Sequence, residues 1–200
     1  MYIRLVAAAA AIASPLVFAA ADAQDVDGHS FTGPRIEATA GWDQVKFDLS
    51  RYAMTGSSKG SGFDWGLEAG YDARLGGNII GGVETGVSFS NLNHGFSDGT
   101  TSYLMHARRD IEISARLGFL VGQNALVYGK AGYTNFQLGS DATTGGVTTV
   151  QHANLDGLRL GAGVELGLSK AMYVKTEYRY SNYQDGVTKN EVLAGLGFRF

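Results

Sequence analysis

The chain of 200 residues contains no cysteine and only two prolines, whereas glycine occurs 29 times. Disulfide bonds are therefore excluded as a source of stability, and so is a lipid-modified cysteine after an export signal. Abundant glycine without proline argues against a collagen-like repeat and against a disordered chain. It suits a strongly curved sheet in which backbones approach closely.

Long hydrophobic runs are also scarce. The main one, Leu5 to Ala20, is short, is interrupted by Pro15, follows a positive start at Arg4 and precedes the small-residue motif Ala21-Asp22-Ala23. This pattern predicts a secretory signal peptide over residues 1–23 rather than a membrane-anchor helix. No later run reaches the roughly 18 apolar residues that a helical span needs.

The rest of the chain is expected to form one domain. We predict a short periplasmic lead-in over residues 24–33 and a barrel over residues 34–200. The net charge is −3, and nothing in the charge balance suggests a nucleic acid partner.

Strict alternation of apolar and polar residues dominates this domain. In the last ten residues, Glu191 to Phe200, one parity is wholly apolar and ends in Phe198 and Phe200, while the other begins with Glu191 and ends with Arg199. Because a β-strand has a period of two, each parity lines one face. The alternation recurs in eight segments, at about residues 34–43, 63–75, 79–90, 108–120, 125–135, 158–166, 172–181 and 191–200.

The connections between these segments alternate in length. Polar, glycine-rich stretches at residues 44–62, 91–106, 136–154 and 182–188 are expected to be outer loops, and residues 76–78, 122–124 and 168–171 short turns. An even number of strands of about ten residues with short turns at one rim is typical of outer-membrane barrels. The sequence therefore predicts an all-β fold, an eight-stranded antiparallel transmembrane up-and-down β-barrel.

Alternation alone would also fit a soluble eight-stranded barrel of the lipocalin type. The placement of aromatic residues favours the membrane, because they would form girdles at both rims around an aliphatic band. The girdle near the long loops comprises Trp42, Phe63, Trp65, Phe89, Tyr133, Tyr178 and Tyr180, and the girdle near the short turns comprises Tyr71, Phe119, Phe198 and Phe200.

The opposite parity places charged residues of both signs in the barrel interior. These are Glu37, Glu68, Asp72, Arg74, Glu84, Glu112, Arg116, Lys130, Arg159, Glu165, Lys175, Glu177, Arg179, Glu191 and Arg199. An eight-stranded barrel is only wide enough for side chains to fill, so the two signs should interlock as ion pairs. Two interpretations remain open: a polar plug that holds the barrel shut, or a narrow path for ions or water between the pairs.

The closing third of the chain resembles a known family. The stretch DGLRLGAGVELGLSKAMYVKTEYRYSNY at residues 156–183, together with the terminal GLGFRF, resembles the opacity-type porin family of small bacterial outer-membrane barrels, which is similar in fold to the membrane domain of OmpA. The first two outer loops match no member in particular. The chain ends at the barrel, so no peptidoglycan-binding domain is expected.

The resemblance implies an integral protein of the outer membrane. Phe198 and Phe200 would form the C-terminal insertion signal that the barrel assembly machinery reads. Outer-membrane lipid and lipopolysaccharide would be the remaining partners, and the protein would be a monomer.

Three functions are compatible with these patterns. The first is a structural or small-solute porin role, and the second is interaction with surface ligands through the outer loops. The third, a lipid-modifying enzyme, is disfavoured, because His29, His94, His106 and His152 show no rigid arrangement with a nucleophile and an acid. They also lack metal-ligand spacing. We therefore expect no catalytic residue, no metal site and no cofactor.

Overall fold

The computed structural model describes residues 31–48, 57–97 and 101–200, almost all of them in β-strands. Their bounds are β1 Gly33–Asp48, β2 Ser57–Gly76, β3 Ile79–Ser90, β4 Asn93–Ser97, β5 Thr101–Val121, β6 Ala125–Thr144, β7 Val147–Gly167, β8 Met172–Tyr183 and β9 Val187–Arg199. The predicted signal peptide, residues 1–23, lies outside the described residues.

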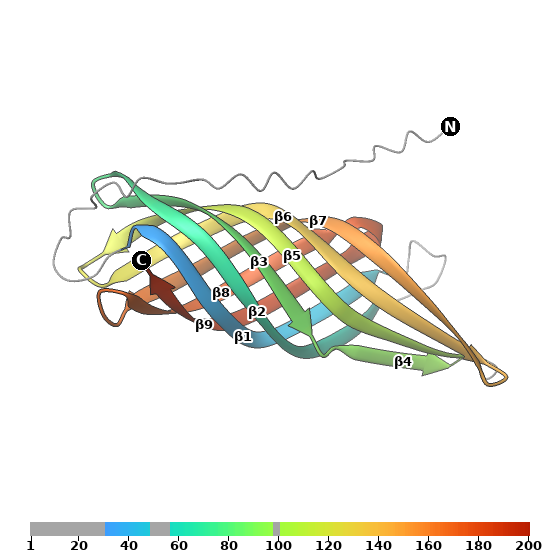
Figure 1. Ribbon diagram of the computed structural model, residues 1–200. Helices are drawn as coiled ribbons and strands as arrows, with labels where there is room; N and C mark the ends of the chain where they lie inside the picture. Colours follow the sequence, from blue (N-terminus) through green and yellow to red (C-terminus); the bar gives the residue numbers. More distant parts are fainter. Residues whose placement is uncertain (1–30, 49–56, 98–100) are drawn as a thin grey trace, which may run out of the picture.

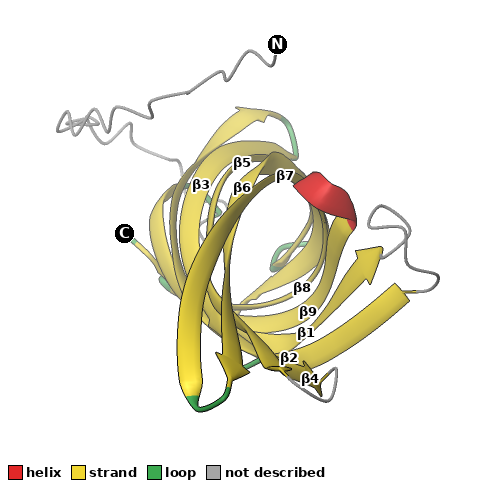
Figure 2. Cartoon of the chain, turned by 90° about the vertical axis from the view of Figure 1, so that its right-hand side faces the viewer, coloured by secondary structure: helices red, strands yellow, loops and turns green. Residues whose placement is uncertain are grey.

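The strands close into a ring. Strands that follow one another along the chain pair antiparallel, except β3 and β4; β3 pairs instead with β5, and β1 pairs with β9. The short β4 continues the line of β3 after a break at Asn91 and Leu92, and it pairs with β5 (Figure 1). The ring therefore has eight members, as predicted, and the view along its axis shows the strands surrounding a common interior (Figure 2).

The short turns fall where the sequence predicted them. Residues 77–78 and 122–124 connect consecutive strands, and glycine meets the backbone requirement there, with φ of +51° at Gly77 and +65° at Gly122. Such positive φ values are strained for other residues. These turns and residues 168–171 lie at the rim that also holds the C-terminus (Figure 1).

The outer connections differ from the prediction. Residues 44–48 and 57–62 extend β1 and β2, and residues 136–154 form a long β-hairpin instead of a loop. This hairpin turns at Gly145 and Gly146, both with positive φ. The outer end of the molecule is therefore built mainly from continued strands, which project past the ring in Figure 1.

Within the part of the chain that the structure describes, the only helical element is η2, a single turn at Gln184–Gly186. It joins β8 to β9 in the predicted fourth loop. None of the described residues belongs to a helix long and apolar enough to cross a membrane.

Candidate functional site in the barrel interior

The two faces of the strands differ sharply in exposure. Large aliphatic side chains on the outward face are open, with exposed fractions of 61% for Leu67, 62% for Ile113 and 71% for Leu158. On the inward face, all the predicted interior charges except Arg74 are buried. The alternation thus locates the interior from sequence alone.

Arg74 is the exception, and its interior prediction is wrong. Its side chain is exposed beside the first short turn, where Nη1 donates a hydrogen bond of 2.7 Å to the Gly77 carbonyl. The register shifts between Arg74 and Gly76. This residue shares the inward parity but lies at the strand end, beyond the lumen.

The structure adds five buried charges that the prediction omitted: Arg35, Asp43, Asp64, Asp110 and Lys189. The first four share the inward parity of neighbouring predicted residues, so the same rule could have found them. Lys189 precedes the segment in which the last strand was predicted, and only the longer β9 brings it inside.

The charged residues form three groups along the barrel axis. Nearest the short turns, Asp72 and Glu165 lie between Arg116 and Arg199. Arg116 Nε donates a 2.8 Å hydrogen bond to Asp72, and Arg199 Nη2 lies 3.1 Å from the same carboxylate. Arg35 Nε also donates a 3.1 Å hydrogen bond to Asp72, so three guanidinium groups face two carboxylates here.

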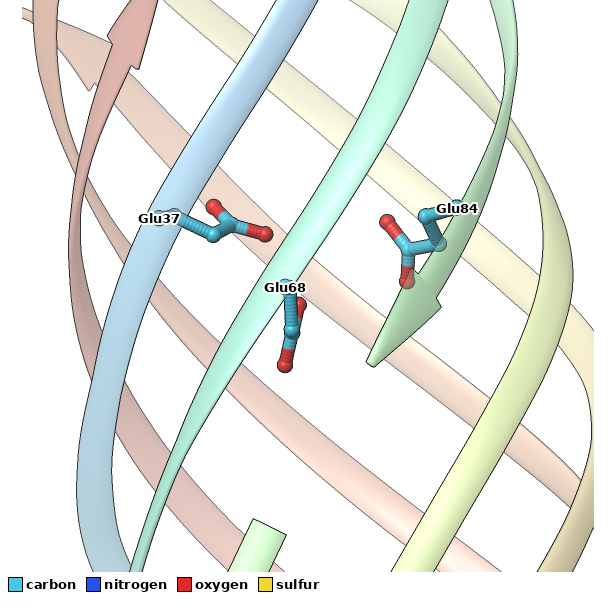
Figure 3. A group of neighbouring side chains, drawn as sticks. All are labelled: Glu37, Glu68 and Glu84. Carbon is cyan, nitrogen blue, oxygen red and sulfur yellow. The ribbon is translucent and has the colours of Figure 1, made fainter. Parts of the chain in front are cut away.

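The middle group contains Glu37, Glu68 and Glu84, which project from adjacent strands β1, β2 and β3 (Figure 3). Their carboxylate oxygens come within 4.8 Å of one another, an arrangement that could hold a metal ion. However, Lys175 Nζ donates hydrogen bonds of 2.8 Å to both Glu37 and Glu68, and Lys130 Nζ donates one of 2.6 Å to Glu84. Ammonium groups therefore already supply the positive charge.

Further cations complete this middle group. Arg35 contacts Glu37 and Glu84. Arg179 contacts Glu68. The remaining acids of the group, Glu112 and Glu177, accept from Lys130 and Arg179 respectively.

The outer group surrounds Lys189. Its Nζ lies 3.5 Å from Asp43, 3.1 Å from Asp64, 3.4 Å from Asp110 and 2.9 Å from Glu191. Arg159 also reaches into this group.

Two clusters of buried apolar side chains lie at the ends of the charged interior. Above the outer group lies an outer cap, formed by Val45, Leu92, Ala107, Phe136, Leu155, Tyr183 and Val187. At the opposite end an inner cap is formed by Phe31, Ile80, Leu120, Leu126 and Tyr128. The sequence prediction missed both caps, and it treated Phe31 as part of a polar lead-in.

The predicted aromatic girdles lie on the outward face. Trp42 pairs across the strands with Phe63, and Trp65 with Phe89, whose ring centroid lies 4.9 Å away. Phe198 lies at the other rim, and all the predicted girdle residues other than the half-buried Tyr71 are exposed. An insertion role for Phe198 and Phe200 stays a prediction.

Side-chain contacts are described for two of the four histidines. His106 Nδ1 lies 4.0 Å from Asp141, and His152 lies against the Arg108 guanidinium. Both are engaged with charged side chains at the outer end. His94 belongs to β4, and His29 lies outside the described residues.

A closed antiparallel ring with an aliphatic outer surface, aromatic rims and a filled polar interior defines an integral β-barrel of the outer-membrane type. Comparison with known proteins agrees. Residues 6–200 match the outer membrane protein beta-barrel domain, and the chain belongs to this family. It is a protein of the outer membrane.

Relatives and fold neighbours are of the same kind. The chain is 28% identical to the 31 kDa outer-membrane immunogenic protein of Brucella melitensis biotype 1, over 89% of this chain and 87% of that protein. Neisserial surface protein A shares the fold at 20% identity and a TM-score of 0.55, over 84% of this chain and 98% of that one. Ail, the attachment invasion locus protein of Yersinia pestis, shares the fold at 16% identity and a TM-score of 0.53, over 84% of this chain and 100% of that one.

Proposed function

We propose that the protein is a closed structural barrel of the outer membrane, whose lumen does not pass solutes and whose outer strands form a surface platform. The observation that carries this proposal is the filled lumen. Buried ion pairs occupy it along its length, and apolar caps lie above and below them.

The outer cap supports closure most directly. Phe136 packs on Tyr183 with ring centroids 5.3 Å apart, and Val45 and Leu92 are buried beside them. An ion crossing this layer would have to leave water for an apolar constriction, which is energetically unfavourable. The narrow path that the sequence left open is therefore the weaker alternative.

Planar bilayer recording of the refolded chain from residue 24 to residue 200 tests the proposal. We expect no steady, discrete openings from protein whose folding is confirmed by heat-shifted gel mobility. Regular openings would support a small porin instead. The Phe136→Ala variant serves as the matched comparison, because it thins the outer cap and should raise the frequency of brief openings.

A second function is favoured by the long outer hairpin. Residues 136–154 project past the ring as part of β6 and β7, and long strands held by a rigid barrel can present a binding surface. The name of the structural neighbour Ail refers to attachment and invasion. We propose that this hairpin contacts a surface ligand.

Shortening the hairpin tests this second proposal. Residues 140–151 would be replaced by Asn-Gly, which joins the paired positions Gly139 and His152 by a tight turn. We expect normal amounts of folded barrel but reduced adhesion of expressing cells to a host-cell monolayer. Unchanged adhesion would remove the hairpin from consideration.

No catalytic role is proposed. His106 and His152, the two histidines whose side-chain contacts are described, are engaged with Asp141 and Arg108. Neither contact supplies the nucleophile that a lipid-modifying reaction would need.

A further inference from the structure

The outer part of β7 has a strand edge on which no other strand pairs. Residues 147–166 pair with β6, but pairing with β8 begins only at Gly157, opposite Tyr183. After Tyr183 the chain turns back through η2 into β9. Among the described residues, β7 therefore has a paired strand on one side only from residue 147 to residue 156. Such an edge presents the N–H and C=O groups of every second residue to the surroundings.

This part of β7 is also exposed on both of its faces. Every residue from Thr148 to Asn154 is exposed, and the exposed fraction of Val150 is 55%. The outward-facing Leu158 lies further down the same strand, in the ring. Because all backbone groups within lipid must be hydrogen-bonded, an unpaired edge fits only the part of β7 that lies above the bilayer. The edge is therefore accessible at the outer end of the molecule, where the hairpin projects past the ring (Figure 1).

The sequence of this edge lacks the usual protection against pairing. Natural proteins protect free edges with charged side chains, proline, bulges or short strand length. Residues 148–154, TTVQHAN, contain no lysine, arginine, aspartate, glutamate, proline or glycine. Threonine and valine instead favour the extended backbone that pairs with another strand. This edge is therefore suited to accept one.

The two other free edges at the outer end are different. The strand β4 is only five residues long. The outer part of β2, residues 57–62, pairs with β1 alone and contains the exposed Lys59 and two glycines. At the base of that edge, Asn91 Oδ1 accepts a 2.7 Å hydrogen bond from the Phe63 amide. Short length, charge and glycine protect these two edges, whereas the edge of β7 has none of these features.

We propose that the β7 edge, defined as residues 148–154, binds an extended segment of an extracellular protein, which adds to the outer hairpin as an antiparallel strand. Backbone hydrogen bonds provide the affinity in this mode of recognition, and side chains next to the edge provide selectivity. The edge is about 23 Å long and offers about seven backbone groups. Its uncharged side chains favour an uncharged segment rich in β-branched residues. This inference rests on the proposal that the hairpin contacts a surface ligand, and it names the class of that ligand.

A second copy of the chain in the same membrane is a poorer partner. Both copies rise from the bilayer in the same direction, so their β7 edges would meet in parallel. Parallel pairing is less stable per residue than antiparallel pairing. A segment of a separate protein above the membrane is free to approach in the antiparallel direction.

Binding of a defined peptide to the chain from residue 24 to residue 200, refolded in lipid vesicles, tests the edge. The probe is a fluorescent, end-capped peptide of alternating threonine and valine, and its control is the same peptide N-methylated at every amide, which cannot donate backbone hydrogen bonds. We expect saturable binding of the first peptide in fluorescence polarisation and none of the second. Absence of binding, or equal binding of the two peptides, would overturn the proposal.

Two lysine variants locate the binding. Val150→Lys places a protecting charge on the edge and should weaken peptide binding about tenfold. Thr143→Lys is the matched control, because Thr143 pairs with Thr148 and so shares the face of Val150, but it lies on β6, whose two edges are both paired. It should change binding less than about twofold. An equal loss in both variants would contradict binding at the β7 edge.

Cross-linking gives a positional readout that does not depend on the folding of Val150→Lys. The chain contains no cysteine, so Val150→Cys and Thr143→Cys each provide a single thiol. Under mild oxidation, a probe peptide with one central cysteine should form a disulfide mainly with the Val150→Cys chain. Equal adducts with the two chains, or a predominance of Val150→Cys dimers over the peptide adduct, would overturn the proposal.

The adhesion assay separates this inference from the proposed function on which it rests. Loss of adhesion in Val150→Lys equal to that of the shortened hairpin would support the edge as the contact. If shortening lowers adhesion and Val150→Lys does not, the hairpin still contacts a surface ligand, but the edge is overturned. Peptide binding with unchanged adhesion in both variants would support the edge and remove the adhesive role.

Discussion

On β1, β6 and β9, the part of the strand that crosses the membrane and the part that continues outward carry the same alternation of apolar and polar residues in opposite phase. On β1, the membrane part turns Glu37 inward and Ala38 outward. After Asp43, the inward positions are Val45 and Phe47, while the outward ones include Lys46. The strand itself continues without interruption, so only its surroundings have changed.

Other strands invert at the same height. On β6, Lys130 faces inward below Tyr133, whereas Phe136 faces inward above it. On β9, Val192 faces outward, and five residues earlier Val187 belongs to the outer cap. Lipid around the lower part favours apolar residues outside, and water around the upper part favours them inside. We infer that the inversion marks the outer boundary of the membrane.

The largest effect should come from the charged interior of the membrane part. Arg159→Gln leaves Asp110, Glu112 and Glu191 without their shared guanidinium. Removing one partner of a buried ion pair costs about 3–5 kcal/mol. Urea unfolding in lipid vesicles should show a loss of this order.

The control for that experiment is Arg108→Gln. Arg108 is exposed on the outer part of β5, and an exposed charge contributes about 0–1 kcal/mol. Equal losses of unfolding free energy for Arg159→Gln and Arg108→Gln would contradict the division of the barrel into a buried interior and a solvent-exposed outer end.

A slightly smaller effect should follow from opening the outer cap. Phe136→Ala removes a ring that packs on Tyr183 and lies 5.4 Å from Lys189 Nζ, and large-to-small core substitutions of this kind cost about 3 kcal/mol. Gln137→Ala, the next residue on the opposite face, should cost almost nothing in the same unfolding assay. The reverse order would show that apolar residues are not buried inside at this level.

The outward face provides the next comparison. Leu67→Arg places a charge against lipid at a site that is 61% exposed, at a cost of about 2 kcal/mol. Ser61→Arg lies six residues away on the same strand and face, where water should accept the charge without loss. The yield of folded barrel in vesicles should separate the two variants, and similar yields would contradict the proposed membrane boundary.

Much of this architecture was predictable because one rule governs the membrane part. The period of two identified the eight members of the ring and placed Lys130 inside although its segment was the least regular. The same rule predicted that β1 ends near Asp43, because beyond that residue the alternation of apolar and polar residues reverses its phase and the composition becomes polar. The outer strands were therefore interpreted as loops.

Partner identity within the lumen was not predictable. Lys175 meets Glu37, which is 138 residues away, because barrel closure and strand stagger bring β8 beside β1 across the interior. Parity gives only the face on which a residue lies, and not its height along the axis. For this reason the sequence did not suggest that Arg74 is exposed.

The smallest effect should be confined to the tip of the outer hairpin. Gly146 has a φ of +85°, in the left-handed region, and an alanine there would cost about 1 kcal/mol. Because the hairpin beyond residue 139 pairs only with itself and β5, this cost should appear as faster amide exchange near the tip, with the unfolding midpoint of the barrel unchanged. Gly122→Ala, at a φ of +65° in a turn of the membrane part, should instead lower that midpoint. If both substitutions lowered the midpoint alike, the outer strands would unfold together with the barrel, and the boundary inferred from the phase inversion would not be a boundary in stability.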